Sequence, residues 1–185
     1  VYIWQNIMAK KAYYILTGPP SSGKTALINY FQHLGYTCFD EMARAIIQEN
    51  KKNNINCFPW NNIKEFSHQV FLRSVDLFVA EPSNSLCFLD RSIVDLIAYL
   101  DLAKIKRNPL YVKTIKDISY NKKVFFLPFW DKIYLNDNER IETKQQALLI
   151  EKHLLLVYRE LGFDLVVVPK LKLEKRADFI LKEIQ

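Results

Sequence analysis

The chain has 185 residues, of which 50% are hydrophobic and 25% are charged. This length suits one domain with one core, since domains usually hold roughly 100 to 200 residues. No uninterrupted apolar run reaches the ~20 residues that a membrane-spanning helix needs, and the N-terminus carries no secretory pattern. We therefore expect a cytoplasmic, single-domain protein spanning residues 1–185, in which residues 1–11 form an N-terminal extension.

The formal net charge is +6, but the basic residues are spread along the chain without the aromatic and basic stripe that single-stranded nucleic acid uses. We expect solvated faces and a phosphate-binding cleft, with nucleic acid disfavoured as a partner. The three cysteines, Cys38, Cys57 and Cys87, have no paired spacing. They favour reduced thiols over a disulfide framework or a zinc site.

Strands and helices are predicted to alternate along the chain. Ala12–Thr17 is a short apolar run of the kind found in a strand buried on both faces. Residues 24–34 have apolar positions at helical spacing, and Gly35 follows as a C-cap. Later strands are predicted at 36–39, 85–89, 123–127 and 164–168, and later helices at 42–49, 63–79, 94–102, 144–161 and 174–184.

Five such strands predict an α/β fold in three layers, with a five-stranded parallel sheet covered by helices on both faces. We expect the second strand to lie beside the first. Residues 50–62 are rich in Lys, Asn and Pro and are predicted to be a mobile loop. Residues 131–143 are polar and are predicted to be a lid.

A phosphate-binding loop is predicted between the first strand and the first helix. GPPSSGKT, residues 18–25, matches G-x-x-x-x-G-K-[ST] at every fixed position. Backbone N–H groups at such a helix start converge on an anion, so the fold is expected to be that of a P-loop NTPase of the nucleoside- and nucleotide-kinase type. Residues predicted to bind ATP are Gly18, Pro19, Pro20, Ser21, Ser22, Gly23, Lys24, Thr25 and Ala26.

Catalysis in such a loop needs a cation on the phosphates and a metal ion. Lys24 is expected to bridge the β- and γ-phosphates, and the Thr25 hydroxyl to bind Mg²⁺. Asp90 ends an apolar strand and is predicted to be the catalytic, metal-side carboxylate. Taken by itself, a strand-end Asp would more often cap the next helix, so its prediction depends on the loop upstream.

Further side chains close to the strand ends are candidates for catalysis and for binding the acceptor. Glu41 is predicted to be a general base or a hydroxyl-binding group, with a helix-start acid as the alternative. Arg44, Arg91 and Asp95 are predicted to bind substrate, and Arg91 also to act in catalysis, although surface ion pairing would account for them too. Arg140 in the predicted lid is expected to stabilise charge on the transferring phosphoryl group.

The chain resembles a group of small P-loop ATPase-like proteins related to the nicotinamide riboside kinase domain of the bifunctional NAD regulator and to an insect GTP- and phosphoinositide-binding trafficking protein. The resemblance covers most of the chain. It rests on the phosphate loop and on EMAR (41–44), FLDRSIVDLIAY (88–99), VFFLPFWDKIYLNDNER (124–140) and VVVPKLKLEKRADFIL (166–181). It implies that Arg176 lies near the adenine, where the alternative is a solvated helix face.

We expect a Mg-ATP-dependent kinase for a small hydroxyl-bearing, nucleoside-like acceptor. The alternative is a nucleotide-switched ATPase or GTPase regulator that binds a protein or lipid partner. Processing of nucleic acid ends is compatible with the fold, but no feature of the sequence is dedicated to it. ATP is preferred to GTP because the sequence has no N-K-x-D motif. The identity of the acceptor and the oligomeric state stay open.

Overall fold

A computed structural model describes residues 12–80, 86–118, 120–133 and 143–185 of the chain. Within them, one sheet holds five parallel strands in the order β2-β3-β1-β4-β5. The strands are β1 (Ala12–Thr17), β2 (Thr37–Phe39), β3 (Leu86–Asp90), β4 (Lys123–Phe126) and β5 (Asp164–Val167). The α-helices are α2 (Lys24–His33), α3 (Met42–Lys52), α4 (Ile63–Ala80), α5 (Ile93–Leu102), α6 (Pro109–Asp117), α7 (Lys144–Glu160) and α8 (Leu173–Glu183).

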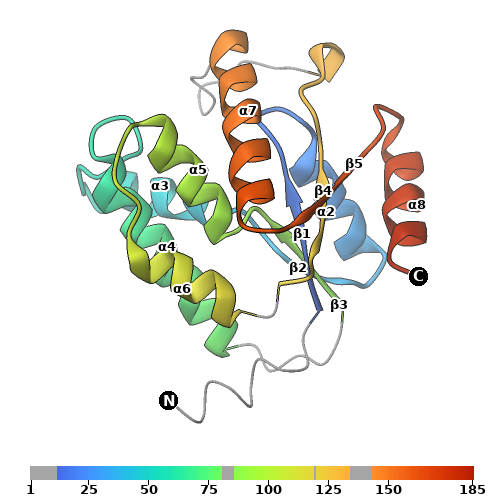
Figure 1. Cartoon of the computed structure of the whole chain (residues 1–185), viewed down its shortest axis with the longest axis horizontal. Coiled ribbons are helices and arrows are strands. Elements are labelled where there is room, and N and C mark those ends of the chain that lie inside the picture. The colour runs from blue at the N-terminus through green and yellow to red at the C-terminus, as the bar shows by residue number, and fades with distance from the viewer. Residues whose placement is uncertain (1–11, 81–85, 119, 134–142) are drawn as a thin grey trace.

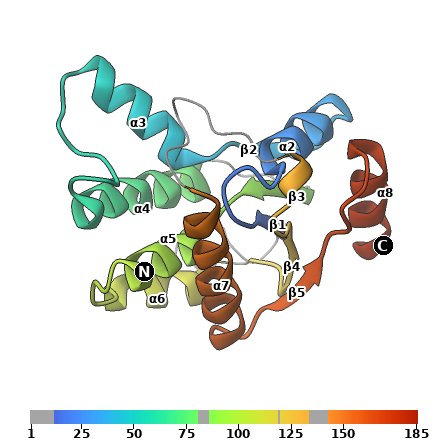
Figure 2. The ribbon, with the colours of Figure 1, turned by 90° about the horizontal axis from the view of Figure 1, so that it is seen from above.

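Helices cover the sheet on both faces, which gives the predicted three layers. Helices α2 and α8 lie on one face, and α4, α5, α6 and α7 lie on the other (Figures 1 and 2). Successive strand residues alternate between the two faces. Ile15 therefore joins the core cluster that contains residues of α4, α5 and α7, whereas Leu16 joins the cluster under α2 and α8. The three-layer α/β fold predicted from the sequence is confirmed.

The position of the second strand in the sheet was predicted wrongly. β2 pairs with β3, and β3 lies between β2 and β1. After β1 and α2, the chain forms β2 one position away from β1 in the sheet. The position between them is occupied by β3, which comes later in the chain. The error has a simple origin, because strand order depends on long-range packing that the local apolar pattern does not contain. Asp90 at the end of β3 is consequently the direct neighbour of Leu16 in β1.

The element boundaries agree with the predicted ones to within a few residues, with two differences. Helix α3 continues to Lys52 and includes Asn50, so the loop predicted at 50–62 begins only at residue 53. Helix α6 was not predicted at all. The Asn108-Pro109 pair could have predicted the start of α6, because asparagine is a preferred N-cap and proline is common in the first turn. In the structure the Asn108 side chain accepts a hydrogen bond from the Leu110 N–H.

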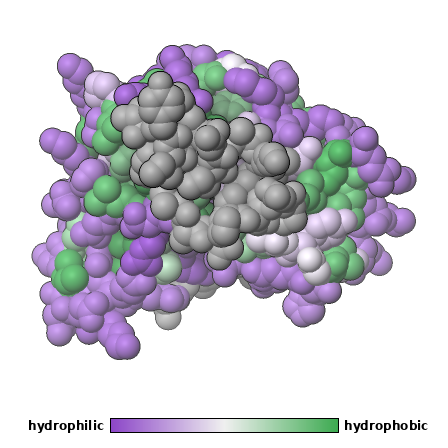
Figure 3. All heavy atoms as spheres, turned by 90° about the horizontal axis from the view of Figure 1, so that it is seen from below, coloured by the Kyte–Doolittle hydropathy of each residue, from purple (hydrophilic) through white to green (hydrophobic). Residues whose placement is uncertain are grey.

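Of the predicted lid, the structure describes a short 3-10 helix, η1 (Asp131–Ile133), and residue 143. Residues 134–142, with the candidate Arg140, lie outside the described residues. The three cysteines are free thiols, as predicted. No helix in the described ranges is long and apolar enough to cross a membrane. Figure 3 shows the molecule from below, where hydrophilic residues predominate on the coloured part of the surface, with smaller groups of hydrophobic ones.

Candidate functional site

The phosphate loop lies at the centre of the sheet, between β1 and α2. Gly18 and Gly23 have φ angles of 147° and 86°, a region that L side chains rarely adopt. A Cβ atom at Gly18 would collide with the carbonyl oxygen of Leu127, and one at Gly23 would lie 2.7 Å from Arg176 Nη1. Both conformation and close packing therefore require the glycines of the sequence motif.

The Lys24 side chain folds back into the loop. Its Nζ donates hydrogen bonds to the carbonyl oxygens of Gly18 and Pro19, both at 2.9 Å, and to Ser22 Oγ at 3.2 Å. Burial, together with the nearby Arg91 guanidinium, lowers the pKa of Lys24 to about 8. The ammonium group is thus held within the loop, where it can donate hydrogen bonds to phosphate oxygens in place of the loop carbonyls.

Asp90 and Thr25 form the pair predicted to hold Mg²⁺. Thr25 Oγ1 donates to Asp90 Oδ2 at 3.1 Å, while Asp90 Oδ1 is buried with no hydrogen-bond partner among the described residues. Burial and the charge of Glu41 raise the pKa of Asp90 to about 6. Mg²⁺ is usually bound by one or two protein oxygens plus substrate phosphates and water, so a hydroxyl beside an unsatisfied carboxylate oxygen fits this ion.

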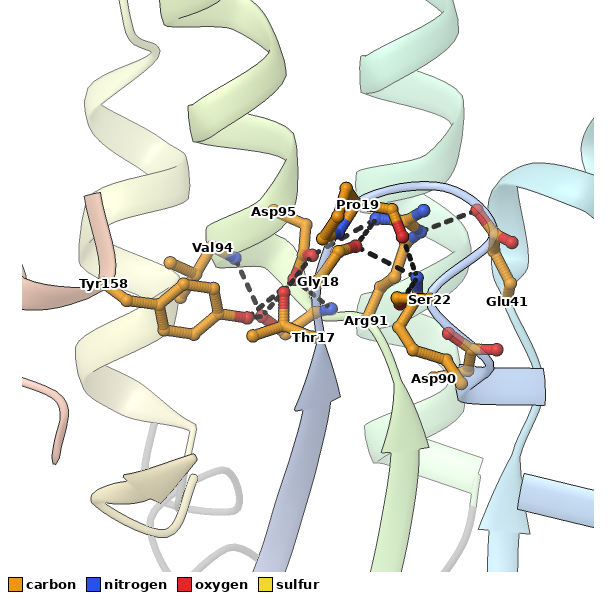
Figure 4. A network of polar contacts seen from close by, with 12 residues as sticks. Thr17, Gly18, Pro19, Ser22, Glu41, Asp90, Arg91, Val94, Asp95 and Tyr158 are labelled. Atoms are coloured by element: carbon orange, nitrogen blue, oxygen red, sulfur yellow. Dashed lines mark hydrogen bonds and ion pairs between the residues drawn. The ribbon is translucent and has the colours of Figure 1, made fainter. Parts of the chain in front are cut away.

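Glu41 and Arg91 form an ion pair across the mouth of the loop (Figure 4). Arg91 Nε donates to Glu41 Oε1 at 2.7 Å, and Arg91 Nη1 donates to the Gly18 carbonyl at 3.3 Å. Arg91 adopts a left-handed φ of 72°, an uncommon conformation that persists where surrounding contacts enforce it. Burial alone would raise the pKa of Glu41, but Arg91 and Lys24 outweigh it and the pKa lies below its ordinary value.

Asp95, which was predicted to bind substrate, lines a cavity and is part of a buried hydrogen-bond network. Its carboxylate is buried and accepts hydrogen bonds from Thr17 Oγ1 at 2.7 Å, Ser92 N at 2.9 Å and Tyr158 Oη at 2.6 Å. These donors come from β1, the start of α5 and α7 (Figure 4). Because both carboxylate oxygens are engaged, the contacts favour a positioning role for Asp95 over contact with a substrate.

Two other predicted arginines, Arg44 and Arg176, also line the cavity. Arg44 Nε is 4.0 Å from Glu41 Oε2, and its side chain is 38% exposed. Arg176 is buried, donates weakly to the Ser22 carbonyl at 3.5 Å and lies 5.7 Å from the centre of the Trp130 ring. The solvated-face alternative for Arg176 is therefore wrong, and this guanidinium packs against the phosphate loop.

One cavity of about 540 Å³ joins these groups. Its nucleotide half is the phosphate loop with Asp90, Arg176 and Ile133. The other part of the lining, called here the acceptor half, combines apolar with polar side chains: Met42, Arg44, Ile47, Gln48, Lys51, Pro59, Trp60, Ile63, Phe66, Ser67, Val70, Ser74, Leu96 and Tyr99. The sequence did not single out the apolar ones, because helical apolar spacing is the same for a core face and for a cavity wall.

Comparisons with known proteins agree with this architecture. A family model described as an AAA domain matches residues 13–176, and the chain therefore belongs to that family. A comparison with curated proteins gives no match. Among solved structures, NadR protein in complex with NR is similar with a TM-score of 0.72 and 15% identity, covering 95% of this chain and 50% of that one. This chain thus spans half the length of that NadR chain.

Two complete kinases of similar size share the fold. Deoxyadenosine kinase from M. mycoides has a TM-score of 0.62 and 14% identity, covering 93% of this chain and 97% of its own. Thymidylate kinase from Ehrlichia chaffeensis has a TM-score of 0.60 and 12% identity, covering 95% of this chain and 100% of its own. The chain therefore has the fold of P-loop nucleoside and nucleotide kinases, as the sequence predicted.

Proposed function

We propose that this protein is a Mg-ATP-dependent kinase that transfers the γ-phosphoryl group to a hydroxyl of a small, nucleoside-like acceptor. The observation that carries the proposal is the position of Glu41. Glu41 lines the same cavity as the phosphate loop, and its carboxylate is paired with Arg91, which also donates to the Gly18 carbonyl. A carboxylate held in this way beside the loop can accept a proton from a hydroxyl that points at bound phosphates.

The reaction would use the described groups in distinct roles. The acceptor oxygen forms a bond to the γ-phosphorus while the bond from that phosphorus to the β,γ-bridging oxygen breaks, so ADP leaves and the acceptor proton passes to Glu41. Lys24 neutralises charge on the β- and γ-phosphates. Thr25 and Asp90 would hold Mg²⁺, which when bound supplies further neutralisation of the phosphates. Arg91 orients the Glu41 carboxylate.

The Glu41 and Arg91 pair also favours a hydroxyl acceptor over one that already carries a phosphate. Arg91 Nε is 2.7 Å from Glu41 and Arg91 Nη1 is 3.5 Å from Asp95. A second dianionic group at this place would meet a guanidinium whose charge is already balanced by two carboxylates. The fold is shared by the NadR protein in complex with NR, by deoxyadenosine kinase and by thymidylate kinase, so this preference rests on the ion pair and not on the fold.

The test is ADP release from Mg-ATP in the presence of a panel of nucleosides and their 5′-monophosphates. We expect at least one nucleoside to stimulate ADP release in the wild type and none to do so in Lys24→Ala. Lys116→Ala, at an exposed position of α6, is the control. Stimulation by monophosphates alone, or acceptor-independent hydrolysis alone, would contradict the proposal, and the latter would favour the nucleotide-switched regulator.

A further inference from the structure

The acceptor half of the cavity has one wall that comes from a loop. Residues 53–62 connect α3 to α4, and Pro59 and Trp60 of this loop line the cavity. The Trp60 ring is 54% exposed and stacks on Phe58, with ring centroids 4.9 Å apart and an interplanar angle of 4°. A large aromatic ring is thereby displayed at the cavity on a segment without regular secondary structure.

Asparagine side chains form hydrogen bonds within this loop. The Phe58 N–H donates to Asn61 Oδ1 at 2.8 Å, Asn61 Nδ2 donates to Asn56 Oδ1 at 2.5 Å, and the Asn62 N–H donates to the Phe58 carbonyl at 2.9 Å. Asn54 has a φ of 55°, a left-handed conformation that asparagine tolerates better than most residues. The asparagine-rich composition that predicts a mobile loop thus provides the loop's internal hydrogen bonds.

Asn50 joins this loop to the two helices that flank it. It is 5% exposed, and its Nδ2 donates to the Cys57 carbonyl at 2.7 Å and to Gln69 Oε1 in α4 at 3.0 Å. The backbone carbonyl of Asn50 accepts a hydrogen bond from the Ile55 N–H at 2.8 Å. The Cys57 side chain is buried in the core cluster beneath the loop. One buried amide therefore ties α3, the loop and α4 together.

We propose that Asn50 is a positioning residue that presents Trp60 as a preformed wall of the acceptor half, so that a flat-ringed acceptor binds without first ordering the loop. Ordering a residue costs about 1–2 kcal/mol of backbone entropy, and a wall built in advance avoids that cost during binding. The function of the wall rests on the proposed kinase activity, whereas its construction by Asn50 does not.

The sharpest variant is Asn50→Asp, which keeps the shape of the side chain but replaces the NH₂ donor by an oxygen that only accepts when ionised. We expect the KM for the nucleoside that the wild type phosphorylates to rise about tenfold, as befits loss of buried hydrogen bonds, with the KM for Mg-ATP changed less than about twofold. Asn53→Asp is the matched control, because Asn53 is exposed and its side chain has no hydrogen bond among the described residues.

A second readout does not depend on catalysis. Cys57 is 6% exposed, and burial raises the pKa of its thiol, so N-ethylmaleimide should modify it slowly in the wild type. We expect modification of Cys57, followed by peptide mapping, to be about tenfold faster in Asn50→Asp and unchanged in Asn53→Asp. Asn50→Ala should behave like Asn50→Asp in both measurements.

The two readouts separate the two proposals. If no nucleoside is phosphorylated by the wild type, the kinase proposal fails, and the rate of Cys57 modification still decides whether Asn50 holds the loop. If the wild type is active but Asn50→Asp leaves both the acceptor KM and the Cys57 rate unchanged, the positioning role of Asn50 is wrong. An equal rise in the KM for acceptor and for Mg-ATP would also overturn it, since that pattern indicates general loss of structure.

Discussion

The two halves of the cavity are built by different means. In the nucleotide half, consecutive residues of one short loop surround the buried Lys24 ammonium with their own carbonyls. In the acceptor half, the wall comes from α3, the 53–62 loop, α4 and α5, and its members, such as Met42, Trp60 and Leu96, are far apart in the sequence. The first half depends on backbone conformation, and the second depends on packing of separate elements.

With the proposed function, this difference would allow chemistry and specificity to vary separately in one molecule. The nucleotide half has little freedom, because Gly18 and Gly23 are fixed by φ and by contacts with Leu127 and Arg176. The acceptor half offers apolar side chains and a loop whose shape depends on the single buried amide of Asn50. Substitutions in the two halves should therefore have different signatures in binding and in catalysis.

The largest effect is expected at Asp90. Asp90→Asn removes the carboxylate that fits Mg²⁺, so phosphoryl transfer should fall by about a thousandfold or more. The same change should stabilise the nucleotide-free protein. The pKa of Asp90 in the folded protein, about 6, is higher than its ordinary value of 3.8. Ionisation of Asp90 therefore destabilises the folded state increasingly as the pH rises from about 3.8 to about 6, and this destabilisation is fully present at pH 8.

Thermal unfolding of Asp90→Asn at pH 8 measures this second effect. We expect an increase of about 1–3 kcal/mol in the free energy of unfolding without nucleotide, and loss of the further stabilisation that Mg-ATP gives the wild type. Asp117→Asn, at an exposed position of α6, should change neither quantity. An Asp90→Asn variant that binds Mg-ATP as the wild type does would disprove the metal-side role.

A smaller effect is expected from a matched pair of glycines. Gly23 and Gly35 have nearly the same φ, 86° and 87°, but a Cβ at Gly35 would meet no atom within 4 Å. Gly35→Ala should cost about 1 kcal/mol of stability from the backbone conformation alone and leave the Kd for Mg-ATP unchanged. Gly23→Ala should also displace Arg176 and weaken Mg-ATP binding by about tenfold or more, as measured by calorimetry.

The pH dependence of nucleotide binding should be smaller again over the neutral range. In the roles proposed for them, Asp90 binds Mg-ATP when ionised and Lys24 when protonated, and their pKa values are about 6 and about 8. The affinity should be greatest between these values and fall by up to about tenfold per pH unit on either side. A flat profile from pH 5 to 9 in the wild type would contradict these assignments.

The sequence predicted the parts that local patterns determine. The phosphate loop, the alternation of strands and helices and the strand-end acids Glu41 and Asp90 are all local features, and the fold brings both acids to the cavity. The predicted position of β2 was wrong because it depends on β3, which comes later in the chain and lies between β1 and β2 in the sheet. The hydrogen bond from Tyr158 to Asp95 could not be predicted, because the two residues are 63 positions apart in the sequence.

The acceptor half could not be predicted because the same residue types have two uses. Phe66 and Val70 follow helical spacing whether they fill a core or line a cavity. The asparagines of the 53–62 loop indicate mobility by composition, although in the fold they form the loop's own hydrogen bonds. The packing of α3 against α4 decides whether such residues fill the core or line the cavity, and the sequence does not contain this information.

The most direct test of the whole account is the turnover of Glu41→Gln with a saturating nucleoside acceptor. We predict that kcat falls by about 10² to 10⁴, the usual contribution of a general base, while the Kd for Mg-ATP changes less than about twofold. Glu49 is an exposed acid in α3, the helix that Glu41 precedes as N-cap, and it pairs with Arg73, so Glu49→Gln should keep full turnover. A Glu41→Gln variant with the turnover of the wild type would contradict the proposed transfer to a hydroxyl acceptor.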